Sequence, residues 1–145
     1  MIMDNYRIFE LTAYDECYLQ PIRELMAQLS SSQHSFGEKE LKAIVDSCDT
    51  HLFLLECDGK ICGMLTLAGY IAPTGRKQWI EDVVVDESMR GRSFGRRLVE
   101  YAIEAARQSG GSLLLTSRPS RVTANALYLS AGFEPRETNV YRIKF

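Results

Sequence analysis

Three apolar segments separated by two tight turns constrain the fold of this chain more than any other feature. The segments 51–57 and 61–70 flank an Asp-Gly pair at positions 58 and 59. Asp-Gly between two apolar runs is a strong hairpin signal, because both turn residues tolerate positive φ. A second turn at 73–75 leads into the β-branched segment 79–85. The pattern predicts a three-stranded antiparallel meander that ends in a buried strand.

Segments with helical spacing of apolar residues lie on both sides of this meander. The expected helices cover 14–30, 38–48, a long stretch that starts after Gly95 and ends at Gly110-Gly111, and 124–131. Pro21 lies inside the first of them. Proline removes a hydrogen-bond donor and clashes with the preceding turn, so the regular helix should start near Pro21 or kink there.

Further strands are expected at 6–11, 113–116 and 140–145. Helices and strands therefore mix along the chain, and no linker is long enough to divide it. We expect one mixed α/β domain that spans residues 1–145.

The composition is that of an ordinary globular domain. Of 145 residues, 46% are hydrophobic and 25% charged, and the formal net charge is −2. This balance gives no basic field for nucleic acid, and no apolar stretch reaches the length of a membrane span, so we expect a soluble, cytoplasmic protein with neither partner. The four cysteines form no C-x-x-C pair and there are only two histidines, so no metal is expected.

A glycine-bearing basic turn between a strand and a helix is the candidate binding element. It reads Arg90-Gly91-Arg92-Ser93-Phe94-Gly95-Arg96. Backbone N–H groups at a helix N-terminus, together with the helix dipole, favour an anion, and the three arginines add positive charge. A pyrophosphate is the expected ligand. The alternative is a solvated, arginine-rich helix start without a ligand.

The segment 83–95 resembles the acyl-CoA-binding motif of the GNAT superfamily of acetyl-CoA-dependent N-acetyltransferases, Arg/Gln-x-x-Gly-x-Gly/Ala after a strand. Arg90 and Gly95 occupy its ends, and Ser93 stands where the first glycine is usual. The segment 124–133 resembles the A-x-x-x-Y-x-x-x-G-F element of the same superfamily. The asparagine that the family carries seven residues before the tyrosine is here Arg121.

The resemblance implies a fold and a cosubstrate. The fold is a mixed, mostly antiparallel central sheet of six to seven strands flanked by about four helices. The cosubstrate is acetyl-CoA, whose pantetheine arm would pair with the main chain of the strand before the turn, in a V-shaped opening beside the strand at 113–116. The implied cosubstrate-binding residues are Val83, Val84, Val85, Arg90, Gly91, Arg92, Ser93, Phe94, Gly95 and Arg96.

The chemistry of amine acetylation requires a base. A lysine-like amine is neutral in fewer than about one molecule in a thousand at pH 7, so a base must remove its proton directly or through water. Glu81 and Asp82 are the candidates, and on a regular strand their side chains point to opposite faces. By resemblance we expect Glu81 as the base and Asp82 as a substrate contact, with Asp82 as base or a structural role for both as alternatives.

The leaving CoA thiolate requires a proton. Tyr128 matches the family tyrosine that has this role, and a tyrosine is protonated at neutral pH. Its alternative role is that of a core tyrosine. A backbone N–H near Val84 would polarise the thioester carbonyl.

The expected function is transfer of an acetyl group from acetyl-CoA to a primary amine of a small molecule by direct attack. The run at 80–85 is especially similar to that of glucosamine-6-phosphate N-acetyltransferases, so an amino-sugar phosphate is the sharpest candidate acceptor. The alternatives are a protein or peptide N-acetyltransferase, a non-catalytic acyl-CoA-binding module and a plain interaction domain. The terminal strand and the meander edge could also pair with a second subunit, which makes a homodimer possible.

Overall fold

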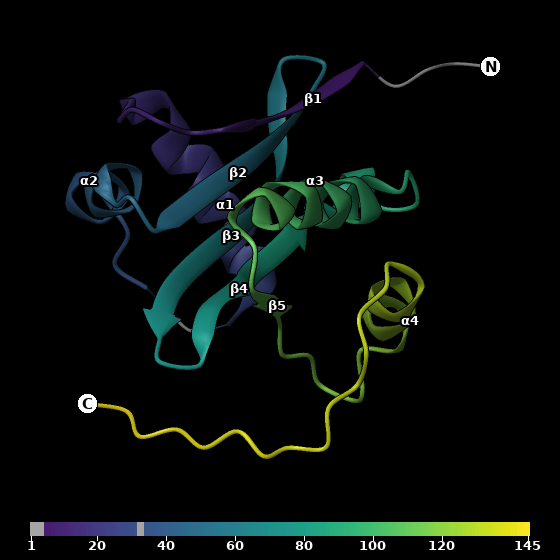
Figure 1. Ribbon diagram of the computed structural model, residues 1–145. Helices are drawn as coiled ribbons and strands as arrows, with labels where there is room; N and C mark the ends of the chain where they lie inside the picture. Colours follow the sequence, from purple (N-terminus) through teal and green to yellow (C-terminus); the bar gives the residue numbers. More distant parts are fainter. Residues whose placement is uncertain (1–4, 32–33) are drawn as a thin grey trace. The chain divides into compact units, whose positions relative to one another are not determined.

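A computed structural model describes residues 5–31 and 34–145 and contains one sheet with the strand order β1-β2-β3-β4-β5 (Figure 1). Its strands are β1 (Tyr6–Glu10), β2 (Thr50–Cys57), β3 (Lys60–Ala72), β4 (Gly75–Val85) and β5 (Ser112–Leu114). The first four pair antiparallel in sequence order, and β5 joins β4 in parallel. The predicted meander is confirmed as β2, β3 and β4.

Two layers of helices cover opposite faces of this sheet (Figure 1). The helices that cover the sheet are α1 (Leu19–Leu29), α2 (Glu38–Asp46) and α3 (Phe94–Ser109). Two short 3-10 helices, η1 (Glu16–Tyr18) and η2 (Glu87–Met89), precede α1 and α3. Successive side chains of β2 point to opposite faces of the sheet and therefore contact different helices. Leu52 and Leu54 belong to the core shared with α1 and α2, whereas the ring of Phe53 meets Tyr101 of α3 edge-on.

The proline in the first helical segment acts as expected. The 3-10 turn η1 precedes α1, and α1 begins at Leu19, so Pro21 lies in its first turn. A proline is tolerated there because the first N–H groups of a helix have no intrahelical partner.

The expected sheet of six to seven strands is wrong, since the described residues form five. The strand predicted at 140–145 does not form. Its apolar residues are exposed, Tyr141 at 88% and Ile143 at 80%. The alternating pattern gives this segment a preference for extended backbone, but a strand also requires an edge whose hydrogen bonds it can complete.

The chain divides into two compact units, Met1–Leu115 and Thr116–Phe145. The first holds the sheet and three helices, and the second holds α4 (Val122–Ser130) followed by extended chain. The predicted helix at 124–131 is confirmed with a start two residues earlier, and the predicted strand at 113–116 is observed as β5, one residue earlier and one residue shorter.

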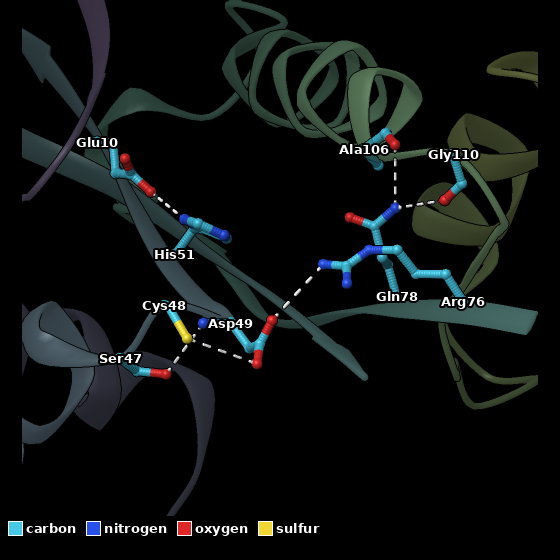
Figure 2. A network of polar contacts seen from close by, with 9 residues as sticks. All are labelled: Glu10, Ser47, Cys48, Asp49, His51, Arg76, Gln78, Ala106 and Gly110. Carbon is cyan, nitrogen blue, oxygen red and sulfur yellow. Dashed lines mark hydrogen bonds and ion pairs between the residues drawn. The ribbon is translucent and has the colours of Figure 1, made fainter. Parts of the chain in front are cut away.

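A buried glutamine ties the end of α3 to the sheet next to β5 (Figure 2). The Nε2 of Gln78 on β4 donates to the carbonyl oxygens of Ala106 and Gly110, both at 3.0 Å. The turn that follows brings Gly111 so close to β4 that a Cβ there would lie 2.2 Å from the carbonyl oxygen of Arg76. Only glycine fits this approach, which fixes where β5 begins to pair with β4.

Candidate active site

A β-bulge in β4 places the two candidate carboxylates. Thr66 of β3 pairs with Glu81 and Met64 pairs with Val84, so two residues of β4 stand opposite Leu65 alone. Asp82 accommodates the extra residue with φ of 51°. A bulge interrupts the regular alternation of side chains and bends the strand.

The bulge interrupts the regular alternation that would place Glu81 and Asp82 on opposite faces of the strand. Both residues are exposed, and their carboxylates interact electrostatically. Partial desolvation raises the pKa of Glu81 above its usual value, and the negative charge of Asp82 raises it further. A carboxylate with a raised pKa is a stronger base than an ordinary glutamate, which is the property that proton removal from an amine requires.

The edge of β4 beyond its short pairing with β5 is open within the first unit. Among the described residues, β5 pairs only with Lys77, Gln78 and Trp79, whereas β3 follows β4 as far as Val85. The backbone groups of Ile80 to Val85 that point away from β3 therefore have no strand partner in the sheet. An extended ligand can complete such an edge by strand-like hydrogen bonding.

The open edge leads directly into the predicted anion-binding turn. After β4 the chain forms η2 and then reaches Gly91 and Ser93, whose φ angles are 84° and 63°. Ser93 is the N-cap of α3, and the first turn of α3 contains no acidic residue. The N–H groups of Phe94, Gly95 and Arg96 have no partner inside the helix, as at any helix N-terminus, and the helix dipole adds positive potential there.

Arginines surround this helix N-terminus. Arg90 and Arg92 are exposed. The guanidinium Nη1 of Arg96 lies 3.6 Å from the carboxylate Oε1 of Glu100, one helical turn further on. Phe94, in contrast, is buried, with its ring 5.3 Å from that of Tyr6. Phe94 thus anchors the start of α3 in the core, so that a rigid element presents the exposed backbone and basic side chains.

The left-handed backbone of Ser93 gives a measurable prediction. A non-glycine residue in this conformation costs on the order of 1 kcal/mol. Ser93→Gly should raise the free energy of unfolding by about 0.5–1 kcal/mol in denaturant titration. Ser109→Gly, at the last residue of the same helix, should lower it instead. Equal destabilisation by both substitutions would contradict the assignment of strain to Ser93.

Tyr128, the predicted acid, lies in the second unit. It is a buried residue of α4, and its ring meets that of Phe133 edge-on at 6.1 Å. The N–H of Phe133 donates to the carbonyl oxygen of Tyr128 at 3.0 Å, and Gly132 makes the turn between them with φ of 109°. The Gly-Phe pair therefore closes α4 and packs on the tyrosine. Arg121, which replaces the family asparagine, immediately precedes α4.

Gln28 is a residue of the site region that the sequence reasoning missed. It lies on α1, and its side chain contacts both Asp86 and Glu87 at the end of β4. Asp86 also accepts hydrogen bonds from the N–H and hydroxyl of Ser88, and these contacts together lower the pKa of Asp86 to about 2. The Asp-x-Ser spacing is a recognisable turn signal. Nothing in the sequence connects this turn to a glutamine 58 residues earlier.

Residues 5–31 and 34–145 contain no cluster of three or more histidines, cysteines, aspartates or glutamates placed to hold a metal ion. None of the helices in the same part of the chain has the length and apolar character needed to cross a bilayer.

An antiparallel meander, a bulged β4 strand and a basic, glycine-bearing turn at the start of α3 together characterise this α/β fold. The family model described as the acetyltransferase (GNAT) family matches residues 14–133. The chain therefore belongs to the GNAT family of acetyltransferases and is an acyltransferase. The matched range includes residues of both compact units.

Three known proteins are similar to this chain in sequence or in fold. Glucosamine 6-phosphate N-acetyltransferase 1 of Oryza sativa subsp. japonica is 29% identical over 139 residues, which cover 90% of this chain and 82% of the rice protein. The crystal structure of glucosamine-6-phosphate N-acetyltransferase from Arabidopsis thaliana is similar with a TM-score of 0.81 and 21% identity, covering 96% of this chain and 98% of the plant protein. The structure of an aminoglycoside N-acetyltransferase in complex with CoA is similar with a TM-score of 0.78 and 16% identity, covering 99% of this chain and 97% of that protein.

Proposed function

We propose that this protein transfers the acetyl group of acetyl-CoA to a primary amine of a small molecule by direct attack of the amine on the thioester. The observation that carries the proposal is the continuity of the open β4 edge with the basic turn at the start of α3. An extended arm bound along the β4 edge and a pyrophosphate bound at the basic turn would belong to one ligand, as they do in CoA. The aminoglycoside N-acetyltransferase of similar fold supports this, since it was solved with CoA bound.

The residues of these two elements would divide the binding of acetyl-CoA between them. Main-chain groups of Val83, Val84 and Val85 would hydrogen-bond the pantetheine arm as an added strand. The pyrophosphate would accept hydrogen bonds from the N–H groups of the turn and of the first turn of α3, with the arginines neutralising its charge. The residues of this second group are Arg90, Gly91, Arg92, Ser93, Phe94, Gly95 and Arg96.

The transfer step requires a base, a carbonyl-polarising group and an acid. Glu81 would remove a proton from the attacking ammonium, directly or through water, while Asp82 contacts the substrate amine. The amine nitrogen then attacks the thioester carbon, and a backbone N–H near Val84 stabilises the negative charge that develops on the carbonyl oxygen. When the C–S bond breaks, Tyr128 would donate its hydroxyl proton to the CoA thiolate, and the excess proton of the amide nitrogen would return to the tyrosinate through water. The raised pKa of Glu81 and the exposure of both carboxylates favour this assignment.

A small molecule is the acceptor we favour, with an amino-sugar phosphate as the first candidate. The rice relative and the Arabidopsis neighbour are named for glucosamine 6-phosphate, and the CoA-bound neighbour is named for aminoglycosides. All of these are amines on sugars.

The test is CoA release from acetyl-CoA with a panel of amines and a no-amine control. The panel contains glucosamine 6-phosphate, glucosamine, an aminoglycoside, a polyamine and short peptides. We expect turnover with a sugar amine and none with peptides. Turnover with peptides alone would overturn the small-molecule assignment. Failure of acetyl-CoA to protect the protein against thermal unfolding would overturn the cosubstrate assignment itself.

We propose that the two compact units act as one acetyltransferase domain, because the cosubstrate-binding turn lies in the first and Tyr128 in the second. A test is expression of residues 1–115 and 116–145 as separate chains, each alone and both together. We expect neither fragment to catalyse acetylation alone. An active first fragment would overturn the proposal.

The exposed segment 140–145 supports the homodimer. Its apolar residues alternate with Arg142 and Lys144, and the strand order leaves the outer edges of β1 and β5 unpaired among the described residues. We propose that this segment adds as a strand to the sheet of a second copy. Light scattering should give twice the chain mass, and Ile143→Lys should give a monomer. A monomeric wild-type protein would exclude this pairing.

A further inference from the structure

We propose that Gln28 is a positioning residue for acetyl-CoA binding. It would act through the turn at residues 86–89, which connects β4 to the proposed anion-binding loop at residues 90–93. This inference rests on the proposed cosubstrate site and adds to it a residue from the opposite layer of the fold. Gln28 lies in the last turn of α1, whereas the anion-binding loop runs into α3 on the other face of the sheet.

The contacts of Gln28 are directional. Its Nε2 donates to Oδ2 of Asp86 at 3.0 Å, and its Oε1 accepts from the N–H of Glu87 at 2.9 Å. The carboxylate can only accept and the backbone N–H can only donate, so the two partners fix the orientation of the amide. One side chain therefore holds two consecutive residues of the turn.

Asp86 receives further support from its own turn. Its Oδ1 accepts from the N–H of Ser88 at 3.0 Å and from the Ser88 hydroxyl at 2.6 Å. Its backbone N–H donates to the carbonyl oxygen of Cys62 on β3 at 2.7 Å. Asp86 is thus fastened to the sheet by its backbone and to α1 by its side chain, and both carboxylate oxygens are engaged.

The turn at Asp86 directly precedes the loop that leads into α3. η2 ends at Met89, and the next four residues lead into α3 through the positive φ angles of Gly91 and Ser93. A loop with two left-handed residues must be held by its flanks, because its own backbone conformation is unfavourable at Ser93. The α3 flank is held by buried Phe94, and Gln28 holds the β4 flank.

Removing the two hydrogen bonds of Gln28 to Asp86 and Glu87 should weaken acetyl-CoA binding and leave the rate of the transfer step unchanged. We expect Gln28→Ala to raise both the KM for acetyl-CoA and the Kd for CoA about tenfold, which corresponds to about 1.4 kcal/mol. The kcat at saturating acetyl-CoA and the KM for the amine should change less than about twofold, because the side chain of Gln28 binds Asp86 and Glu87, neither of which is a proposed reacting group. Gln20→Ala is the matched control, since Gln20 lies on the same helix and its side-chain amide donates to Glu24 of that helix.

A role-reversal variant separates positioning from general stability. Gln28→Glu should be worse than Gln28→Ala, because it sets two carboxylates against each other. Adding Asp86→Asn to Gln28→Glu restores every hydrogen bond with donor and acceptor exchanged: the introduced amide donates to the introduced carboxylate, which still accepts from the N–H of Glu87. We expect this double variant to recover CoA affinity to within about threefold of wild type.

The outcomes distinguish the two proposals. Wild-type protein that binds no CoA in calorimetry overturns the cosubstrate site. Wild-type binding with unchanged Kd in Gln28→Ala overturns the positioning role, as does a lowered thermal midpoint without any change in Kd. A double variant that binds CoA as weakly as Gln28→Glu also overturns it, because the restored hydrogen bonds would then be irrelevant to binding.

Discussion

Tyr128→Phe is expected to lower kcat by at least about 100-fold while the Kd for CoA changes less than about twofold. Loss of a general acid removes about two to four orders of magnitude from a rate, because the thiolate must then leave unprotonated or take its proton from water. The substitution removes one hydroxyl and keeps the ring that packs edge-on against Phe133. The measurement is steady-state CoA release together with calorimetric CoA binding.

Tyr101→Phe is the control for this prediction. Tyr101 also meets a phenylalanine edge-on, but it is an exposed residue of α3 outside the proposed site. Its variant should retain wild-type kcat. A Tyr128→Phe protein that retains full activity would assign Tyr128 to the core alone, and one that loses CoA binding would show that its hydroxyl serves the binding site instead.

Glu81→Gln is expected to lower kcat/KM for the amine by at least about 100-fold, since glutamine cannot accept the proton of the attacking ammonium. Asp82→Asn should chiefly raise the KM for the amine, because Asp82 is the proposed substrate contact. The reverse pattern, with Asp82→Asn losing the larger share of kcat, would make Asp82 the base. Glu104→Gln, which alters an exposed ion pair with Arg107 on α3, is the matched control.

The pH dependence follows from the raised pKa of Glu81. The base must be ionised, so kcat/KM should fall as the pH drops through this pKa, and the fall should begin above the usual glutamate range. Asp82→Asn removes the neighbouring negative charge and should shift the inflection to lower pH. A profile whose acid limb is identical in wild type and Glu81→Gln would contradict the assignment.

Much of the fold could be predicted because it depends on local patterns. The meander and the start of α1 follow from the sequence, because they depend on signals between near neighbours in the chain. These signals are the Asp-Gly turn, the apolar runs and the position of Pro21. The segment 140–145 shows the limit of such reasoning. Its alternation favours an extended backbone, and the pairing that makes a strand depends on an edge far away in the sequence.

The candidate site was predictable only in part. The basic glycine turn and the A-x-x-x-Y-x-x-x-G-F element are contiguous motifs that point to their residues directly. The bulge at Asp82 is different, because two residues of β4 face one of β3 only once the register of the pair is set. The sequence alone therefore does not reveal that the alternation is interrupted between Glu81 and Asp82.

The sequence by itself determined the meander, the helices, the location of the glycine-bearing basic turn before α3 and the candidate acid and bases. Tertiary structure alone decided the five-stranded pairing, the open edge of β4 and the clamp of Gln28 on Asp86. The physical reason is the range of the forces involved. Backbone preferences and capping act between near neighbours in the chain, whereas register and side-chain hydrogen bonds between layers exist only after distant segments have packed.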